Sequence, residues 1–98
     1  MDGDKILMKK ISSKQRNILR KEAHTLKPVV MIGKNGVTPE LIAAVDTALA
    51  DHELIKIKFQ DFKEDRRALT RALSDSVKAI VISVIGNIAI LYRELDKD

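Results

Sequence analysis

The sequence predicts an α/β domain with the element order α-β-α-β-α-β-β, in which helices pack on a four-stranded mixed sheet. Apolar residues switch repeatedly between helical and strand periodicity along the chain. Two successive strand–helix–strand units favour parallel pairing through crossover connections, whereas a closing hairpin adds an antiparallel pair. A length of 98 residues suits one domain, so we expect residues 1–98 to form a single domain with an ordered core from about residue 11 to 93.

A first amphipathic helix is expected from a cap at Ser12 or Ser13 to about Thr25, and Pro28 prevents its continuation. Its apolar residues fall on one arc, which comprises Ile11, Ile18, Leu19, Ala23 and Leu26. The opposite arc is mostly basic and comprises Lys10, Lys14, Arg16, Asn17, Arg20, Lys21, His24 and Lys27. This helix therefore separates a core side from a basic side.

A short strand and a strongly capped helix follow. Residues 29–32 are apolar and rich in β-branched side chains, which predicts a buried strand. Thr38 is expected to cap a second helix that begins at Pro39, has Glu40 in its first turn and continues through Asp51. Because residues 54–59 alternate whereas residues 29–32 do not, we expect the strand from Val29 to be the more central one.

Residues 54–59 alternate between apolar and basic side chains and predict a second strand, with Ile55, Ile57 and Phe59 facing inward and Lys56 and Lys58 facing outward. A third helix is expected after a capping box of Asp61 and Glu64. Its apolar stripe comprises Leu69, Ala72, Leu73 and either Val77 or Ile80. Residues 81–85 and 88–92 predict two strands that are joined by a two-residue turn with Gly86 first.

The net charge of +4 is unevenly distributed. Residues 5–36 contain nine basic residues and one acid, Glu22, and so carry +8, whereas the rest of the chain carries −4. A split of this kind favours a polyanion partner for one surface, although a solvated basic helix face is the simpler alternative.

A glycine turn offers a second feature suited to an anion. Gly33, Lys34, Asn35 and Gly36 lie between the first strand and the capped second helix. The glycines permit positive φ and close approach of a ligand to the backbone, the helix N-terminus behind them supplies N–H groups, and Lys34 adds a charge. The spacing excludes a nucleotide-triphosphate P-loop, since only two residues separate Gly33 and Gly36. A single phosphate is the expected ligand, although many such loops are only tight turns.

Other charged residues allow two interpretations. Lys56 and Lys58 either extend a phosphate track across the strand or protect an edge strand from aggregation. Arg66, Arg67 and Arg71 are interleaved with acids, so intrahelical ion pairs are the expected explanation for them.

No enzyme is predicted. The two histidines lie in different elements, there is no cysteine, and no metal-ligand spacing or nucleophile–base set is present, so we expect no metal and no cofactor. The N-terminus lacks the apolar run of a signal peptide, and the longest apolar stretches are too short to span a bilayer. We expect a cytoplasmic protein with neither a membrane partner nor a small-molecule substrate.

The three aromatic residues are too few for extensive base stacking. Binding through phosphates and shape is therefore expected, which favours folded or duplex RNA over splayed single strands.

Several blocks of the sequence resemble the CRM domain (chloroplast RNA splicing and ribosome maturation). Residues 26–38, with the sequence LKPVVMIGKNGVT, resemble the segment that holds its Gly-x-x-Gly loop. Residues 52–58, HELIKIK, resemble a second block, and residues 84–86 and 91–93 resemble the closing hairpin. The resemblance extends from about residue 11 to 93. Many members carry a basic residue after the hairpin glycine, where this chain has Asn87.

The resemblance implies a fold similar to the C-terminal domain of translation initiation factor three, and RNA binding. Stand-alone prokaryotic members associate with precursors of the large ribosomal subunit. The resemblance assigns RNA contact to residues 33–36, with the basic first helix beside them. The leading hypothesis is thus a ribosome assembly factor that binds ribosomal RNA through Gly33, Lys34, Asn35, Gly36, Arg16, Arg20, Lys27, Lys10, Lys14, Lys56 and Lys58. The alternatives are a protein-interaction module that docks on an acidic partner and a small phospho-ligand enzyme.

Overall fold

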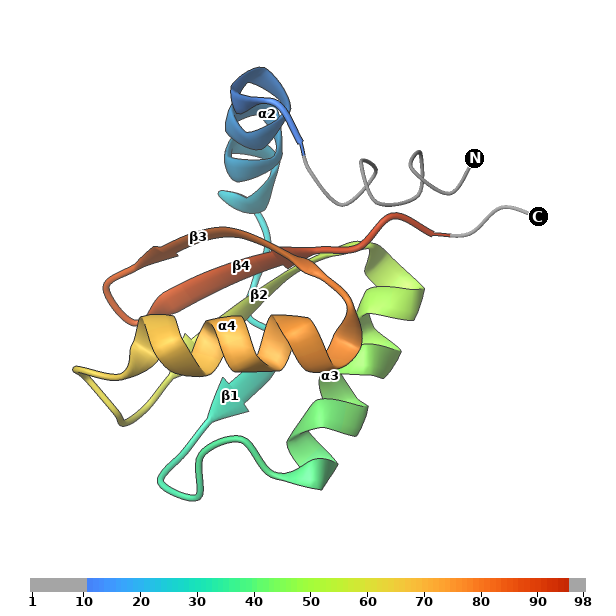
Figure 1. Cartoon of the computed structure of the whole chain (residues 1–98). Helices are drawn as coiled ribbons and strands as arrows, with labels where there is room; N and C mark the ends of the chain where they lie inside the picture. The colour runs from blue at the N-terminus through green and yellow to red at the C-terminus, as the bar shows by residue number, and fades with distance from the viewer. Residues whose placement is uncertain (1–10, 96–98) are drawn as a thin grey trace.

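The computed structural model describes residues 11–95 as one α/β unit, which confirms the predicted fold class (Figure 1). Its elements are α2 (Ser13–Ala23), β1 (Val30–Ile32), α3 (Pro39–His52), β2 (Leu54–Phe59), α4 (Arg66–Val77), β3 (Ile80–Ile85) and β4 (Ile88–Tyr92). The order of elements is the predicted one. Within this described range, every helix is too short or too polar to cross a membrane.

The sheet has the strand order β1-β2-β4-β3. β1 pairs with β2 in parallel, and β4 lies antiparallel between β2 and β3. β1 is therefore an edge strand and β2 an interior one, so the expectation that the strand from Val29 is more central was wrong. The alternation of apolar and polar side chains shows which face of a strand is buried. Whether the strand lies at the centre of the sheet depends instead on which strands pair with its two edges.

The larger core lies between α3, α4 and one face of the sheet. Ile55, Ile57 and Phe59 point into it from β2, as predicted. The remaining fully or nearly buried members are Val30, Ile32, Val45, Leu49, Leu73, Val77, Val84, Ala89 and Leu91. This core fixes α3 directly behind the turn that follows β1.

The opposite face of the sheet is covered only in part, by α2. Ala23 of the helix packs with Leu54, Ile82 and Ile90 in a separate, smaller cluster. Ile18 does not join it and is 47% exposed, so its assignment to the core arc was wrong. Within residues 11–95, Met31 and Ile85 of this face stay exposed.

The helix starts follow local capping chemistry, with one correction. Ser12 and Gln15 form a capping box at the start of α2, which ends at Ala23, earlier than expected. The predicted capping box of Asp61 and Glu64 was wrong, since α4 begins only at Arg66. The Asp61 carboxylate instead accepts a hydrogen bond from the N–H of Phe62 at 2.8 Å.

The buried side of α4 also differs from the predicted stripe. Thr70 and Ser74 occupy buried positions, whereas Ala72 is exposed and Ile80 opens β3. The closing hairpin agrees with the sequence. Ile85 pairs with Ile88 across a two-residue turn, and Gly86 at its first position has a φ of 59°.

We expect Leu49→Ala to lower the free energy of unfolding by about 2–5 kcal/mol, because it empties a fully buried position between α3 and the sheet. Urea denaturation measures this loss, with exposed Thr47→Ala on the same helix as the control. Equal midpoints for the two variants would contradict the packing of α3 on the sheet.

Candidate nucleic-acid interface

The glycine turn joins the end of β1 to the start of α3. It is closed by a hydrogen bond that the N–H of Gly36 donates to the carbonyl of Gly33, at 3.0 Å. Gly36 has a φ of 71°, which favours glycine, whereas Gly33 does not adopt a positive φ. A Cβ at Gly33 would approach nothing closer than Gln60, at 3.7 Å. The backbone conformation therefore favours glycine at position 36, whereas position 33 could carry a side chain without strain or clash.

The free donors of the turn are fewer than the sequence indicated. Thr38 caps α3 by accepting a hydrogen bond from the N–H of Leu41 at 3.1 Å, and Pro39 has no N–H to offer. In the part of the chain that the structure describes, no hydrogen bond engages the N–H groups of Lys34 and Asn35. Among the described residues, the N–H of Glu40 in the first turn of α3 is likewise unengaged. An anion at this turn would therefore meet backbone donors of the turn and of the helix start, together with the Lys34 ammonium.

A shallow hollow of about 450 Å³ runs beside the turn along the open edge of β1. The turn residues line it together with residues of β1 and of the start of α3. Glu40 is the acidic residue among the lining residues, so an anion is favoured at the glycine end.

Residues after β2 support the turn from behind. The N–H of Gln60 donates to the carbonyl of Ile32 at 2.8 Å. The Phe62 ring lies 3.5 Å from the point where a Cβ on Gly36 would be. Arg66 donates to the Gly86 carbonyl at 3.1 Å and lies over the Phe59 ring, 5.8 Å from its centroid. The sequence did not single out Phe62 for this role, and no local pattern marks it.

Arg16 is not on the solvent side of α2, contrary to the sequence assignment. Its guanidinium donates to the carbonyls of Val81 and Ile82 at 2.6 and 2.9 Å. β3 is an edge strand whose register with β4 shifts between Val81 and Ser83, so these carbonyls have no strand on their outer side. Arg16 thereby fastens α2 to the edge of the sheet.

The other predicted contacts of α2 remain at the surface. Lys14 and Lys27 are exposed, and half-buried Arg20 hydrogen-bonds the Asn17 side chain. Lys10 lies outside the described residues. Lys27 belongs to the segment that leads from α2 to β1.

The basic helix does not lie beside the glycine turn, which corrects that expectation. Figure 1 shows α2 at the top of the molecule and the turn between β1 and α3 at the bottom. Lys56 and Lys58 lie between them, on the sheet face that α2 partly covers, because they alternate with core residues of β2. Since β2 is an interior strand, protection of an edge cannot explain these lysines.

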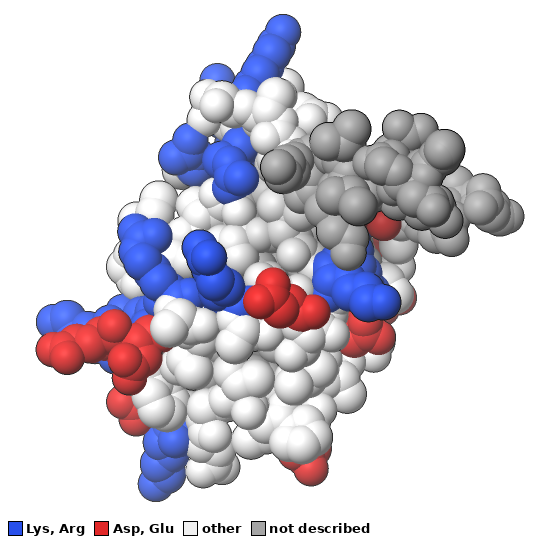
Figure 2. Space-filling view, viewed as in Figure 1, with Lys and Arg blue, Asp and Glu red and all other residues white. Residues whose placement is uncertain are grey.

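Negative charge gathers on other parts of the surface. The acids of α3 and its C-terminal end are Glu40, Asp46, Asp51 and Glu53, and Asp46 pairs with Arg93 at 2.7 Å. Burial, and then the carboxylates of Glu94, Glu53 and Glu22, raise the pKa of Tyr92 at the end of β4. Figure 2 shows cationic side chains near α2 and at the turn below, with a band of both signs between them.

The intrahelical ion pairs expected for Arg66, Arg67 and Arg71 are absent from residues 11–95, so that interpretation was wrong. Arg66 contacts the hairpin instead.

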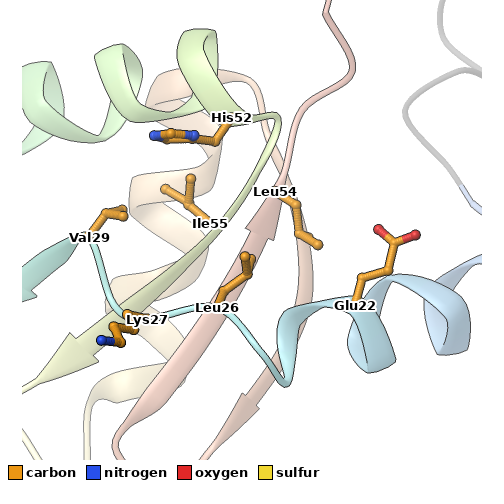
Figure 3. Close-up of a pocket in the computed structure, with 7 residues that line it drawn as sticks. All are labelled: Glu22, Leu26, Lys27, Val29, His52, Leu54 and Ile55. Carbon is orange, nitrogen blue, oxygen red and sulfur yellow. The ribbon is translucent and has the colours of Figure 1, made fainter.

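A second hollow of about 420 Å³ lies where the chain passes from α2 to β1. Its charged and imidazole side chains are Glu22, Lys27 and His52, and Figure 3 shows that they do not point toward one another. Across residues 11–95, no three histidine or acidic side chains come together as metal ligands. Neither hollow therefore assembles the groups of an acid–base site.

The geometry defines a small α/β domain whose basic surface is built from α2, β2 and the turn after β1. Residues 11–93 match the model of the CRS1 / YhbY (CRM) domain, so the chain belongs to this family. An RNA-binding protein of Haemophilus influenzae is 40% identical over 87 residues, covering 88% of each chain. "Probable RNA-binding protein YqeI" of Bacillus subtilis is 35% identical over 86% of this chain and 88% of its own length.

A solved structure has the same fold. The solution structure of SAV1595 from Staphylococcus aureus superposes with a TM-score of 0.78 at 32% identity, covering 91% of this chain and 94% of the other.

We expect Gly36→Ala to lower the free energy of unfolding by about 1 kcal/mol and Gly33→Ala to leave it nearly unchanged, because only Gly36 has a positive φ. Thermal or urea unfolding of the two variants measures the difference. Equal losses would contradict the turn geometry.

Arg16→Ala is expected to lower the free energy of unfolding by about 1–3 kcal/mol, because two edge carbonyls of β3 lose a charged donor. Lys14→Ala, on the exposed side of the same helix, is the control and should change it little. If the two variants unfold alike, Arg16 does not hold α2 on the sheet.

Proposed function

We propose that this protein binds structured RNA without chemistry of its own and acts in the cytoplasm as a ribosome assembly factor on precursor large-subunit RNA. The observation that carries RNA binding is the placement of Lys58 and Lys56 on β2, between α2 and the turn that holds Lys34 and the free backbone donors. The names of the Haemophilus influenzae and Bacillus subtilis relatives support it. The ribosomal part depends on the resemblance of this chain to stand-alone prokaryotic CRM proteins.

The phosphate backbone is the part of RNA that this surface suits. One phosphate is held by the Lys34 ammonium and the N–H groups of Lys34 and Asn35, with Gly33 allowing close approach. The flanking phosphates then meet Lys58 and Lys56 on the sheet. Farther along, the RNA meets the cations Lys27, Arg20 and Lys14 of the α2 region, while Arg16 keeps its carbonyl contacts. Lys10, which the sequence also predicts as a contact, lies outside the described residues.

Readout by aromatic stacking is not part of this proposal. Phe59 is 1% exposed, Phe62 backs Gly36, and Tyr92 packs at the edge of the α2 cluster. A surface of lysines and backbone donors recognises the shape and phosphates of folded RNA more than its sequence.

The same lysines would also suit an acidic protein, which is the alternative function. Unengaged backbone N–H groups beside a lysine can donate to a phosphate or to a carboxylate oxygen, so the glycine turn alone does not choose between these partners. The relatives named as RNA-binding proteins favour RNA.

We expect Lys34→Gln and Lys58→Gln each to weaken binding to an RNA hairpin and to reduce the salt dependence of affinity by about one phosphate contact. Lys78→Gln, at the far end of α4, is the matched control and should leave the slope unchanged. Titrations at several salt concentrations measure the slope. Unaltered slopes for both variants would contradict the proposed track.

Crosslinking in cells, followed by sequencing of the attached RNA, tests the biological target. Precursor large-subunit RNA is expected among the recovered molecules. Recovery of an acidic protein partner without RNA would instead support the alternative.

A further inference from the structure

We propose that the part of the sheet face left open by α2 binds unpaired nucleotides, with bases against Met31 and Ile85 and phosphates at Lys58 and Lys56. This inference depends on the proposed RNA binding and adds the kind of RNA segment that the surface recognises. It extends the interface from phosphate contacts to direct contacts with bases.

The open strip is one row of side chains that crosses all four strands. Strand register places Met31 beside Lys58, Lys58 beside Ile88, and Ile88 beside Ile85. Adjacent strands lie about 4.8 Å apart, so the row is roughly 14 Å wide, enough for a short run of nucleotides. The row also adjoins the glycine turn, because Met31 lies two residues before Gly33. The side-chain amide of Gln60, which lies next to this turn, donates a hydrogen bond to the Met31 sulfur.

Apolar exposure concentrates on this strip. Met31 is 56% and Ile85 62% exposed, the two highest values among the large apolar side chains of the described residues. Half-exposed Val29 lies beside Lys56, to whose carbonyl its N–H donates at 3.0 Å. The cluster with Ala23 buries Ile90, one row nearer to α2, and only partly covers Ile88. Within residues 11–95, the two ends of the row, Met31 and Ile85, therefore stay exposed.

The charge of the strip identifies the occupant. Lys58 lies in the row of Met31, Ile88 and Ile85. Lys56 lies in the neighbouring row, with Ile90 and Ser83, and neither row contains an acid. Apolar side chains interleaved with lysines suit a ligand that carries apolar faces and negative charges in alternation. Unpaired nucleotides have this chemistry, because each base offers a flat apolar face and each phosphate a charge.

A second copy of this chain is a poorer occupant. Two such faces packed together would bring their lysines into a shared apolar interface, and desolvating like charges is unfavourable. A duplex is also a poorer fit, because its bases are stacked within the helix and do not reach the methyl groups of Met31 and Ile85.

Two RNA hairpins of about 16 base pairs, one continuous and one interrupted by a short run of unpaired adenosines, test this inference. Wild-type protein should bind the interrupted hairpin about tenfold more tightly. Met31→Ser/Ile85→Ser should lose this preference while keeping the affinity and salt slope for the continuous hairpin. Met31→Leu/Ile85→Val should keep the preference, and Ala72→Ser on the exposed side of α4 is the polar control. Thermal unfolding checks that the variants fold.

The outcomes separate the two proposals. If wild type binds both hairpins equally, or if the serine variant retains the preference, the base contact is overturned and the proposed function stands. If wild type binds neither hairpin in a salt-dependent way, both proposals fail. If sedimentation shows a wild-type dimer that Met31→Ser/Ile85→Ser dissociates, the strip belongs to self-association and the inference is overturned.

Discussion

The alternation of side chains along β2 is the constraint on which the rest of the molecule depends. Because β2 lies between β1 and β4, its side chains must serve both faces of the sheet. Ile55, Ile57 and Phe59 anchor the core under α3 and α4. On the other face, Leu54 binds α2 by apolar contact, whereas Lys56 and Lys58 farther along the strand stay outside that contact. A single strand thereby fixes the helices and sets the site where phosphates can be held.

The end of the sheet that carries the glycine turn is a set of connected loops. The turn rests on Phe62, while Arg66 joins the segment before α4 to the closing hairpin. The contact of Phe62 with Gly36 and the hydrogen bond from Gly36 to Gly33 fix the turn without using the backbone donors of Lys34 and Asn35. At the opposite end, the Arg16 guanidinium donates hydrogen bonds to carbonyls at the edge of β3, so its main role is structural. Position in the fold therefore decides which cations are free for a ligand.

The sequence predicted the element order, the span of β2, the Thr38 cap and the hairpin, because each depends on local periodicity or capping. Strand order was beyond it, so β1 was placed too centrally. The exposure of Ile18, the carbonyl contacts of Arg16 and the support from Phe62 all arise from residues distant in sequence, which local patterns do not encode. Helical projection placed Lys14 and Lys21 on the exposed side of α2, but it misplaced Arg16 and could not tell that the glycine turn lies at the other end of the sheet.

In the proposed function, RNA follows one side of the sheet from the glycine turn across β2 to α2. Amide chemical-shift mapping during titration with an RNA hairpin tests this path directly. We expect the largest changes at Lys34 and Asn35, with further changes at Lys56, Lys58 and Lys27. Changes confined to α3, on the acidic side of the molecule, would contradict it.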